Sequence, residues 1–183
     1  GIVLVQWLCL SVSLYFAVKC FDLATEDGAP LWAALLLLLP MGYVMSYTMS
    51  GGNLTEELSL PFLMPCLYLF LKYLNGTRLP TPENQDHSGR AGFFYGVVFG
   101  IMAMIRVTNA ALIGAILLTV TCNLVAWKRI RNLFANAGSF LLGVAVGTMP
   151  GLLWCWWKGI LPDMLGQVFL FGFAYSEEGG VLE

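Results

Sequence analysis

The chain has 183 residues, of which 58% are apolar and only 11% charged, and its mean hydropathy is +0.77. Soluble domains are usually about 45–50% apolar and about 25% charged, so these few charges could not cover a soluble surface. The formal net charge of −2 excludes a basic nucleic-acid binder and a disordered acidic tail. The composition therefore predicts an integral membrane protein of the all-α class, with no nucleic-acid partner.

Six apolar stretches approach the length of about 20 residues that a membrane-spanning helix needs. The expected spans are residues 2–21, 31–48, 55–74, 91–105, 110–127 and 133–157. The fourth and fifth must be separated by a break, which is expected near residues 105–109, because residues 91–127 as one helix would reach about 55 Å, more than a bilayer. A further stretch, 161–175, is expected to lie at the interface or to begin another span. The spans form one transmembrane bundle over residues 1–183, which we expect to be an internal fragment because the chain begins at Gly1 inside an apolar run.

Charge sorts to the two sides of this six-span arrangement. With the polar loop 75–90 in the cytoplasm, seven of the nine basic residues fall at cytoplasmic ends, as the positive-inside rule expects. Glu56, Glu57 and Arg106 then lie on the opposite, outer side. His87, the only histidine, falls in the polar loop and is expected to be a solvated residue without a partner.

Glycines spaced four residues apart occur in the fourth and sixth spans. They are Gly92, Gly96 and Gly100, and Gly143, Gly147 and Gly151. Such a spacing lines one face of a helix with small residues, which lets a second helix approach closely. The pattern therefore predicts tight helix packing. Trp154, Trp156 and Trp157 close the sixth span, where interfacial aromatic residues are expected.

Two acidic residues follow the Gly-Gly turn that precedes the third span. One interpretation is a capping box, with Asn53 as the N-cap and Glu56 three residues later. Acidic residues at this position are also favoured by the helix dipole. The functional interpretation is compatible with both, because carboxylates at a membrane boundary can hold a metal or a polar substrate. Glu56 and Glu57 are therefore candidate site residues.

Arg106 is the second candidate, since it follows only 15 apolar residues and should lie at or just inside the outer boundary. It can be an anchor whose side chain reaches the interface, or it can pair with phosphate oxygens. Thr108 and Asn109 could cap the next helix and add hydrogen-bond donors to the same place.

The order of these features resembles the multi-span glycosyltransferases of the GT-C superfold. The resemblance is carried by Gly51-Gly52-Asn53-Leu54-Thr55-Glu56-Glu57-Leu58-Ser59-Leu60-Pro61-Phe62 and by Gly96-x-x-x-Gly100-Ile101-x-x-x-x-Arg106-x-Thr108-Asn109. It is strongest to the protein O-mannosyltransferase and lipid A aminoarabinose transferase group. It covers roughly residues 5–175, with short motifs, and Val107 stands where many relatives have proline.

The resemblance implies a transferase that takes a sugar from a polyprenyl-phosphate donor at the outer face of a membrane, most simply the bacterial cytoplasmic membrane. Glu56, with Glu57 beside it, matches the second acidic position of the site and can help bind a divalent metal. Arg106, with Asn109, matches the turn that neutralises the donor phosphate. The family's principal catalytic base lies in an earlier outer loop, which this sequence does not contain, so the fragment alone is expected to be inactive.

Two other classes remain open on the sequence. Glu56 and Arg106 could line the translocation path of a transporter or flippase subunit, or the chain could be a membrane scaffold without chemistry. An inverted repeat of the spans would favour a transporter. The sugar and the acceptor are not specified by any motif.

Overall fold

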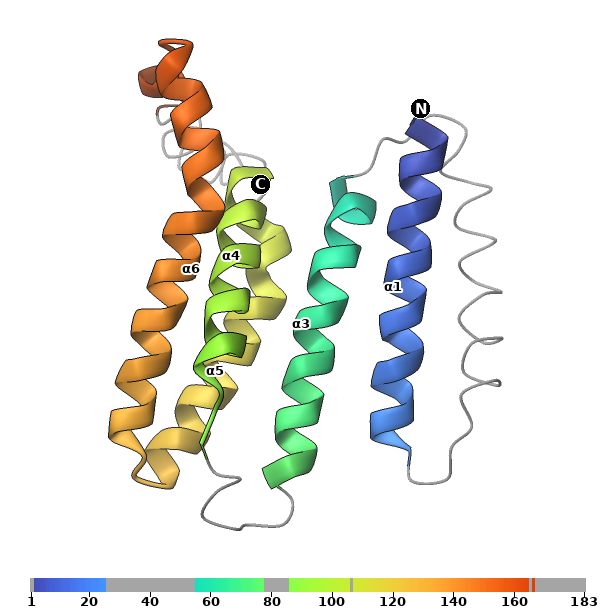
Figure 1. The fold of residues 1–183 in the computed structure, drawn as a ribbon, viewed down its shortest axis with the longest axis vertical. Helices are drawn as coiled ribbons and strands as arrows, with labels where there is room; N and C mark the ends of the chain where they lie inside the picture. The colour runs from blue at the N-terminus through green and yellow to red at the C-terminus, as the bar shows by residue number, and fades with distance from the viewer. Residues whose placement is uncertain (1, 26–54, 78–85, 106, 165, 167–183) are drawn as a thin grey trace, which may run out of the picture. The chain divides into compact units, whose positions relative to one another are not determined.

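A computed structural model describes residues 2–25, 55–77, 86–105, 107–164 and 166, and every regular element in these ranges is helical (Figure 1). The elements are α1 (Ile2–Ala24), α3 (Thr55–Thr77), α4 (Gly89–Ile105), the 3₁₀ helix η1 (Val107–Ala110), α5 (Ala111–Ala126) and α6 (Ile130–Trp157). The chain divides into two compact units, residues 1–147 and 148–183. The all-α fold class is confirmed, while the expected span 31–48 lies outside the described residues.

The break near Arg106 lies where the sequence predicts it. Helix α4 ends at Ile105, and η1 leads directly into α5. Ala110, the residue before α5, has φ −79° and ψ −5° and makes no side-chain capping bond. The expectation that Thr108 or Asn109 caps α5 is therefore wrong. The physical reason is that η1 runs into α5 with a helical backbone at Ala110, whereas a capping side chain needs an extended residue at the N-cap.

Four of the helices are long and apolar enough to cross a membrane. These segments are Leu4–Ala24, Leu58–Thr77, Thr108–Ala126 and Ile130–Trp157, and α4 is a shorter apolar helix. The chain is thus an integral membrane protein. Because lipid is as apolar as the helix surfaces, these helices are held together mainly by close packing and by polar contacts.

Helices α1 and α3 run side by side in the same direction (Figure 1). The aromatic rings of Phe16 and Tyr68 pack at 5.9 Å between their centroids. Near the carboxyl ends of both helices, the side-chain amide of Asn75 donates a hydrogen bond of 2.5 Å to the carbonyl oxygen of Leu23. That bond satisfies one of the carbonyls that a helix leaves unpaired in its last turn.

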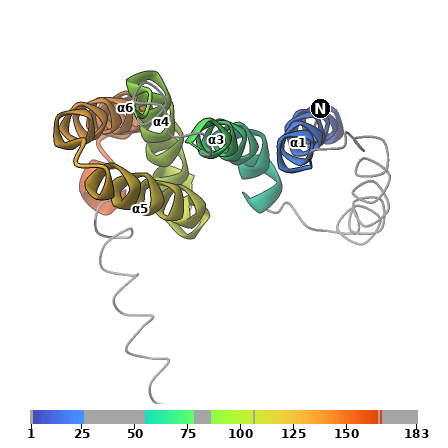
Figure 2. The ribbon, with the colours of Figure 1, turned by 90° about the horizontal axis from the view of Figure 1, so that it is seen from below.

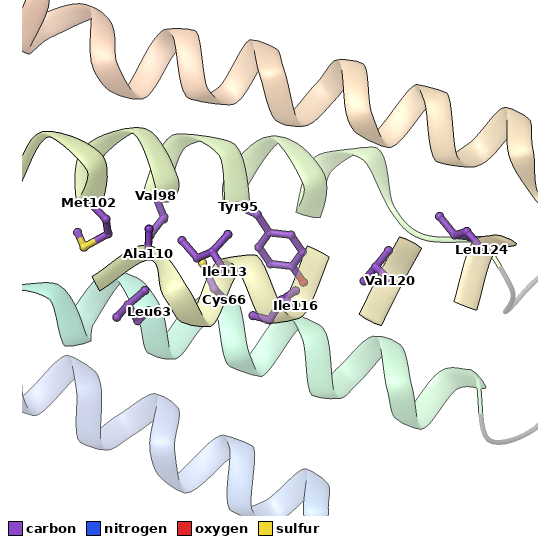
Figure 3. Packing of buried hydrophobic residues seen from close by; sticks show 10 residues of the cluster. All are labelled: Leu63, Cys66, Tyr95, Val98, Met102, Ala110, Ile113, Ile116, Val120 and Leu124. Atoms are coloured by element: carbon purple, nitrogen blue, oxygen red, sulfur yellow. The ribbon is translucent and has the colours of Figure 1, made fainter. Parts of the chain in front are cut away.

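The core of the first unit lies between α3, α4 and α5 (Figure 3). Its buried members are Leu63, Cys66, Tyr95, Val98, Met102, Ala110, Ile113, Ile116, Val120 and Leu124. Leu63, Met102 and Ala110 lie towards one end of this row, and Val120 and Leu124 lie towards the other. The row therefore fixes which ends of the three helices lie together.

Helix α6 packs on α4 through the predicted glycines. The end view of the bundle shows the ribbons of the two helices next to each other (Figure 2). A Cβ atom on Gly96 would overlap the backbone of Phe140, and one on Gly143 would overlap the backbone of Phe93. A Cβ on Gly147 would likewise meet the backbone of Val97. The two backbones are thus in direct contact, and the prediction of close packing is confirmed for these glycines.

The second unit contains the last part of α6 and the turn that follows it. Gly159 in this turn has φ +72°, a left-handed conformation that glycine adopts without strain and that commonly ends helices. Trp154, Trp156 and Trp157 are exposed, and the ammonium group of Lys158 lies 5.1 Å from the ring centroid of Trp157. Their place in an interfacial belt stays a prediction. Of the stretch 161–175, residues 161–164 and 166 are helical, and the remainder lies outside the described residues.

Candidate functional site

The start of α3, the end of α4 and η1 lie at one end of the first unit. Leu63, two turns into α3, shares a packed core with Met102 near the end of α4 and with Ala110 at the end of η1. Helix α4 runs antiparallel to α3 (Figure 1). The start of α3, which precedes Leu63, therefore lies near the end of α4, which follows Met102. Elements separated by about fifty residues in the chain thus meet at one site.

Three of the predicted site residues, Glu56, Glu57 and Asn109, belong to these helix ends. Glu56 and Glu57 occupy the first turn of α3, where the helix dipole favours carboxylates, although their side chains are outside what the structure describes. Arg106 lies outside the described residues. The side chain of Asn109 is half-buried, and its Nδ2 atom has no hydrogen-bond partner within the described part of the chain.

Carboxylates and a spare amide donor lie on the described helix ends, and the sequence predicts that the guanidinium of Arg106 joins them. Carboxylates can accept a proton or hold a cation, and Arg106 with the amide of Asn109 can donate hydrogen bonds to phosphate oxygens. No group of three or more metal-ligating side chains is found among the described residues, which do not include the side chains of Glu56 and Glu57.

The opposite end holds a polar cluster that the sequence does not reveal. His87 is only 4% exposed, so the expectation of a solvated histidine without a partner is wrong. Its ring packs against Tyr73 and Tyr95, with centroid separations of 4.9 and 5.7 Å. Burial occurs because α6 begins at Ile130, earlier than predicted, and its first turns place two asparagines beside the residue.

These two asparagines bind the backbone of His87. Its N–H donates to Oδ1 of Asn132 at 3.0 Å, and its carbonyl oxygen accepts from Nδ2 of Asn132 at 3.1 Å. The same carbonyl also accepts from Nδ2 of Asn136 at 3.0 Å. The start of α4 is thereby joined to the first turns of α6. Asn132 and Asn136 are four residues apart, which places both on the same helix face.

The bonds of Asn136 also define the tautomer of the imidazole. Its Nδ2 faces the carbonyl oxygens of His87 and Asn132, so its Oδ1 must be the atom that lies 2.7 Å from Nδ1 of His87. An amide oxygen can only accept, and therefore Nδ1 carries the proton. In the neutral ring Nε2 is then a bare acceptor, and it has no partner within the described residues.

Basic side chains surround this end, as the charge pattern predicts. Lys72 and Arg90 line a cavity of about 590 Å³ between α3 and α4. Lys128, Arg129 and Arg131 line a second, of about 520 Å³, around the α5–α6 turn. Asp86 borders both and pairs with Arg129 at 3.8 Å. These basic side chains thus lie at the same end of the bundle, as the charge pattern predicts. That this end faces the cytoplasm stays a prediction.

The protein should lose stability as the pH falls below about 6.5, the ordinary histidine pKa. Burial lowers the pKa of His87, and the hydrogen bond to Asn136 offsets part of that shift. Below the ordinary value the unfolded chain binds a proton that the folded chain binds less readily, so stability is complete at higher pH and declines towards acid. Thermal unfolding in detergent between pH 5 and 8 measures this.

The variant His87→Gln provides the control, because His87 is the only histidine in the chain. It should be less stable at neutral pH but should lose most of the pH dependence between pH 5 and 7. An unchanged slope in the variant would show that another group is responsible.

Comparison of the chain with protein-family models, with curated proteins and with solved structures gives no match. The site is therefore interpreted from its own residues.

Proposed function

We propose that this chain is part of a GT-C-type glycosyltransferase that transfers a sugar from a polyprenyl-phosphate donor at the outer face of a bacterial cytoplasmic membrane. The observation that carries the proposal is the meeting of the start of α3, the end of α4 and η1 at one end of the core. These are the elements that bear the acidic pair and Arg106 in the resembling sequences.

The chemistry needs few protein groups. The acceptor hydroxyl attacks the anomeric carbon, the bond from that carbon to the phosphate oxygen breaks, and the phosphate leaves with the electron pair. Arg106 and the amide of Asn109 stabilise the leaving anion. Glu56 and Glu57 are the candidate catalytic carboxylates that line the site and orient the acceptor hydroxyl, while the principal base would come from the earlier outer loop. A divalent metal bound at Glu56 would supply further stabilisation of the anion.

The test is an assay of the whole protein in its membrane. Vesicles from cells that express it, and from cells that do not, are supplied with a radiolabelled polyprenyl-phosphate sugar or with the corresponding nucleotide sugar. We expect release of polyprenyl phosphate with the first donor only, with addition of divalent metal as one variable. The donor itself is followed, so the acceptor need not be known in advance.

Two results would contradict the proposal. Movement of the intact donor across the vesicle membrane without cleavage would favour a flippase, in which Glu56 and Arg106 line the path. Equal donor cleavage in both vesicle preparations would remove the enzymatic assignment.

A further inference from the structure

The turn between α5 and α6 concentrates positive charge. Lys128, Arg129 and Arg131 line a cavity of about 520 Å³ at this turn, and Asp86 is the only acidic residue in its described lining. Oδ1 of Asp86 lies 3.8 Å from Nε of Arg129, whereas no ion pair is seen for Lys128 or Arg131 within the described residues. The cavity therefore has an excess of positive charge that the described chain does not neutralise.

The backbone of the turn holds these side chains in a defined arrangement. The N–H of Lys128 donates to the carbonyl oxygen of Val125 at 3.0 Å, and the N–H of Arg129 donates to the carbonyl oxygen of Leu124 at 2.8 Å. Lys128 has φ +56°, a left-handed conformation that glycine adopts at lower cost and that commonly follows the end of a helix. A lysine with an exposed side chain thus occupies a position where the backbone favours glycine.

This turn lies at a membrane surface. Helices α5 and α6 are both long and apolar enough to cross a membrane, and only residues 127–129 separate them. A turn between two crossing helices must lie where the hydrocarbon core ends, at the depth of the lipid headgroups. Ile130 lines the cavity, and Phe134, one turn further along the same face of α6, is 72% exposed. Apolar surface for acyl chains therefore lies beside the basic cavity.

We propose that this cavity binds the headgroup of an anionic phospholipid, with Lys128 and Arg131 as its phosphate ligands. Hydrogen bonds from ammonium and guanidinium groups to phosphate oxygens are strong because both partners are charged. Three cations against one carboxylate disfavour the choline group of a zwitterionic lipid, so the site should select a lipid with net negative charge. Ile130 and Phe134 contact the acyl chains. Basic pockets beside spanning helices typically bind anionic headgroups in this way.

The affinity of the protein for single lipids tests this assignment. Native mass spectrometry of the protein in detergent counts the bound lipids and gives their dissociation constants. One molecule of phosphatidylglycerol should bind about ten-fold more tightly than phosphatidylcholine with the same acyl chains, as expected for one charge-assisted hydrogen bond. Equal affinity for the two lipids would overturn the proposal. Glycerol phosphate should bind far more weakly than phosphatidylglycerol, and equal affinity for these two would contradict a lipid as the ligand.

Two lysines at the same end of the bundle provide matched variants. Lys128 and Lys72 are both exposed, but Lys72 lines the cavity between α3 and α4 instead. Lys128→Gln should weaken the binding of phosphatidylglycerol about ten-fold, because one phosphate ligand is lost. Lys72→Gln makes the same change in net charge and should weaken it less than about two-fold, since a distant exposed charge is largely screened. Equal weakening in both variants would indicate general attraction to a basic surface and would contradict the site.

The variant Lys128→Gly separates lipid binding from folding. It removes the same ammonium group and suits the left-handed backbone, so its thermal unfolding temperature should stay close to that of the wild type. Its affinity for phosphatidylglycerol should fall as far as that of Lys128→Gln, and an unchanged affinity would contradict the proposal. The result does not depend on the proposed glycosyl transfer, because lipid binding is measured without a sugar donor.

Discussion

Replacing Gly143 by alanine should disrupt the packing of α4 against α6, with a loss of stability of about 3 kcal/mol or more. Overpacking a tight contact usually costs about 1–3 kcal/mol when side chains can move. Here the added methyl group would overlap the backbone of Phe93 and approach that of Val97, and backbone cannot move away without separating the helices. Thermal unfolding in detergent, followed by circular dichroism, measures the loss.

Gly138→Ala is a closely matched control. It is the same substitution on the same helix, but a Cβ atom at Gly138 would meet nothing within 4 Å. Alanine favours a helix over glycine by up to about 1 kcal/mol, so this variant should be neutral or slightly stabilised. Of these two alanine variants five residues apart, only Gly143→Ala should therefore lose stability. Equal stability of Gly143→Ala and the wild type would rule out the backbone contact.

The second large effect concerns activity. In the whole protein, Glu56→Gln and Arg106→Ala should each reduce sugar transfer by about 10²–10³-fold or more. The glutamine keeps the shape of the side chain but removes the negative charge that would hold a metal or orient the hydroxyl, and the alanine removes the cation that opposes the leaving phosphate. Cleavage of the polyprenyl-phosphate donor in membrane vesicles is the measurement.

The controls for these variants are charged residues at the opposite end of the bundle, one on α4 and one on α1. Arg90→Ala changes an exposed arginine at the start of α4, and Asp22→Asn changes an exposed acid near the end of α1. Both should retain transfer within about two-fold, and all four proteins should insert at equal levels. Wild-type turnover in Glu56→Gln and Arg106→Ala would remove these residues from the site.

The helices of this chain are largely predictable because a membrane imposes a simple rule on sequence. An apolar stretch of the right length forms a helix, since every backbone group must be bonded within the segment. The glycine faces are predictable for a similar reason, because a four-residue spacing has one geometric meaning. That the apolar stretch 91–127 must be broken follows from its length, and the described helices α4 and α5 agree.

The cluster around His87 could not be predicted in the same way. It depends on contacts between residues 45 and 49 positions apart, and asparagine in a helix has no periodic signal. The only sequence signal was the spacing of Asn132 and Asn136 on one face at the start of an apolar helix. That spacing can be interpreted only when it is known that both asparagines bind His87, which lies just before α4.

The same contacts have a consequence for how the protein is made. His87 obtains its main polar partners from Asn132 and Asn136, which leave the ribosome more than forty residues later. Until then, Asn132 and Asn136 cannot supply the hydrogen bonds that the backbone of His87 makes in the folded chain. The burial of His87 therefore requires that α6 has been made, and this end of the bundle is completed only after the last of its helices is synthesised.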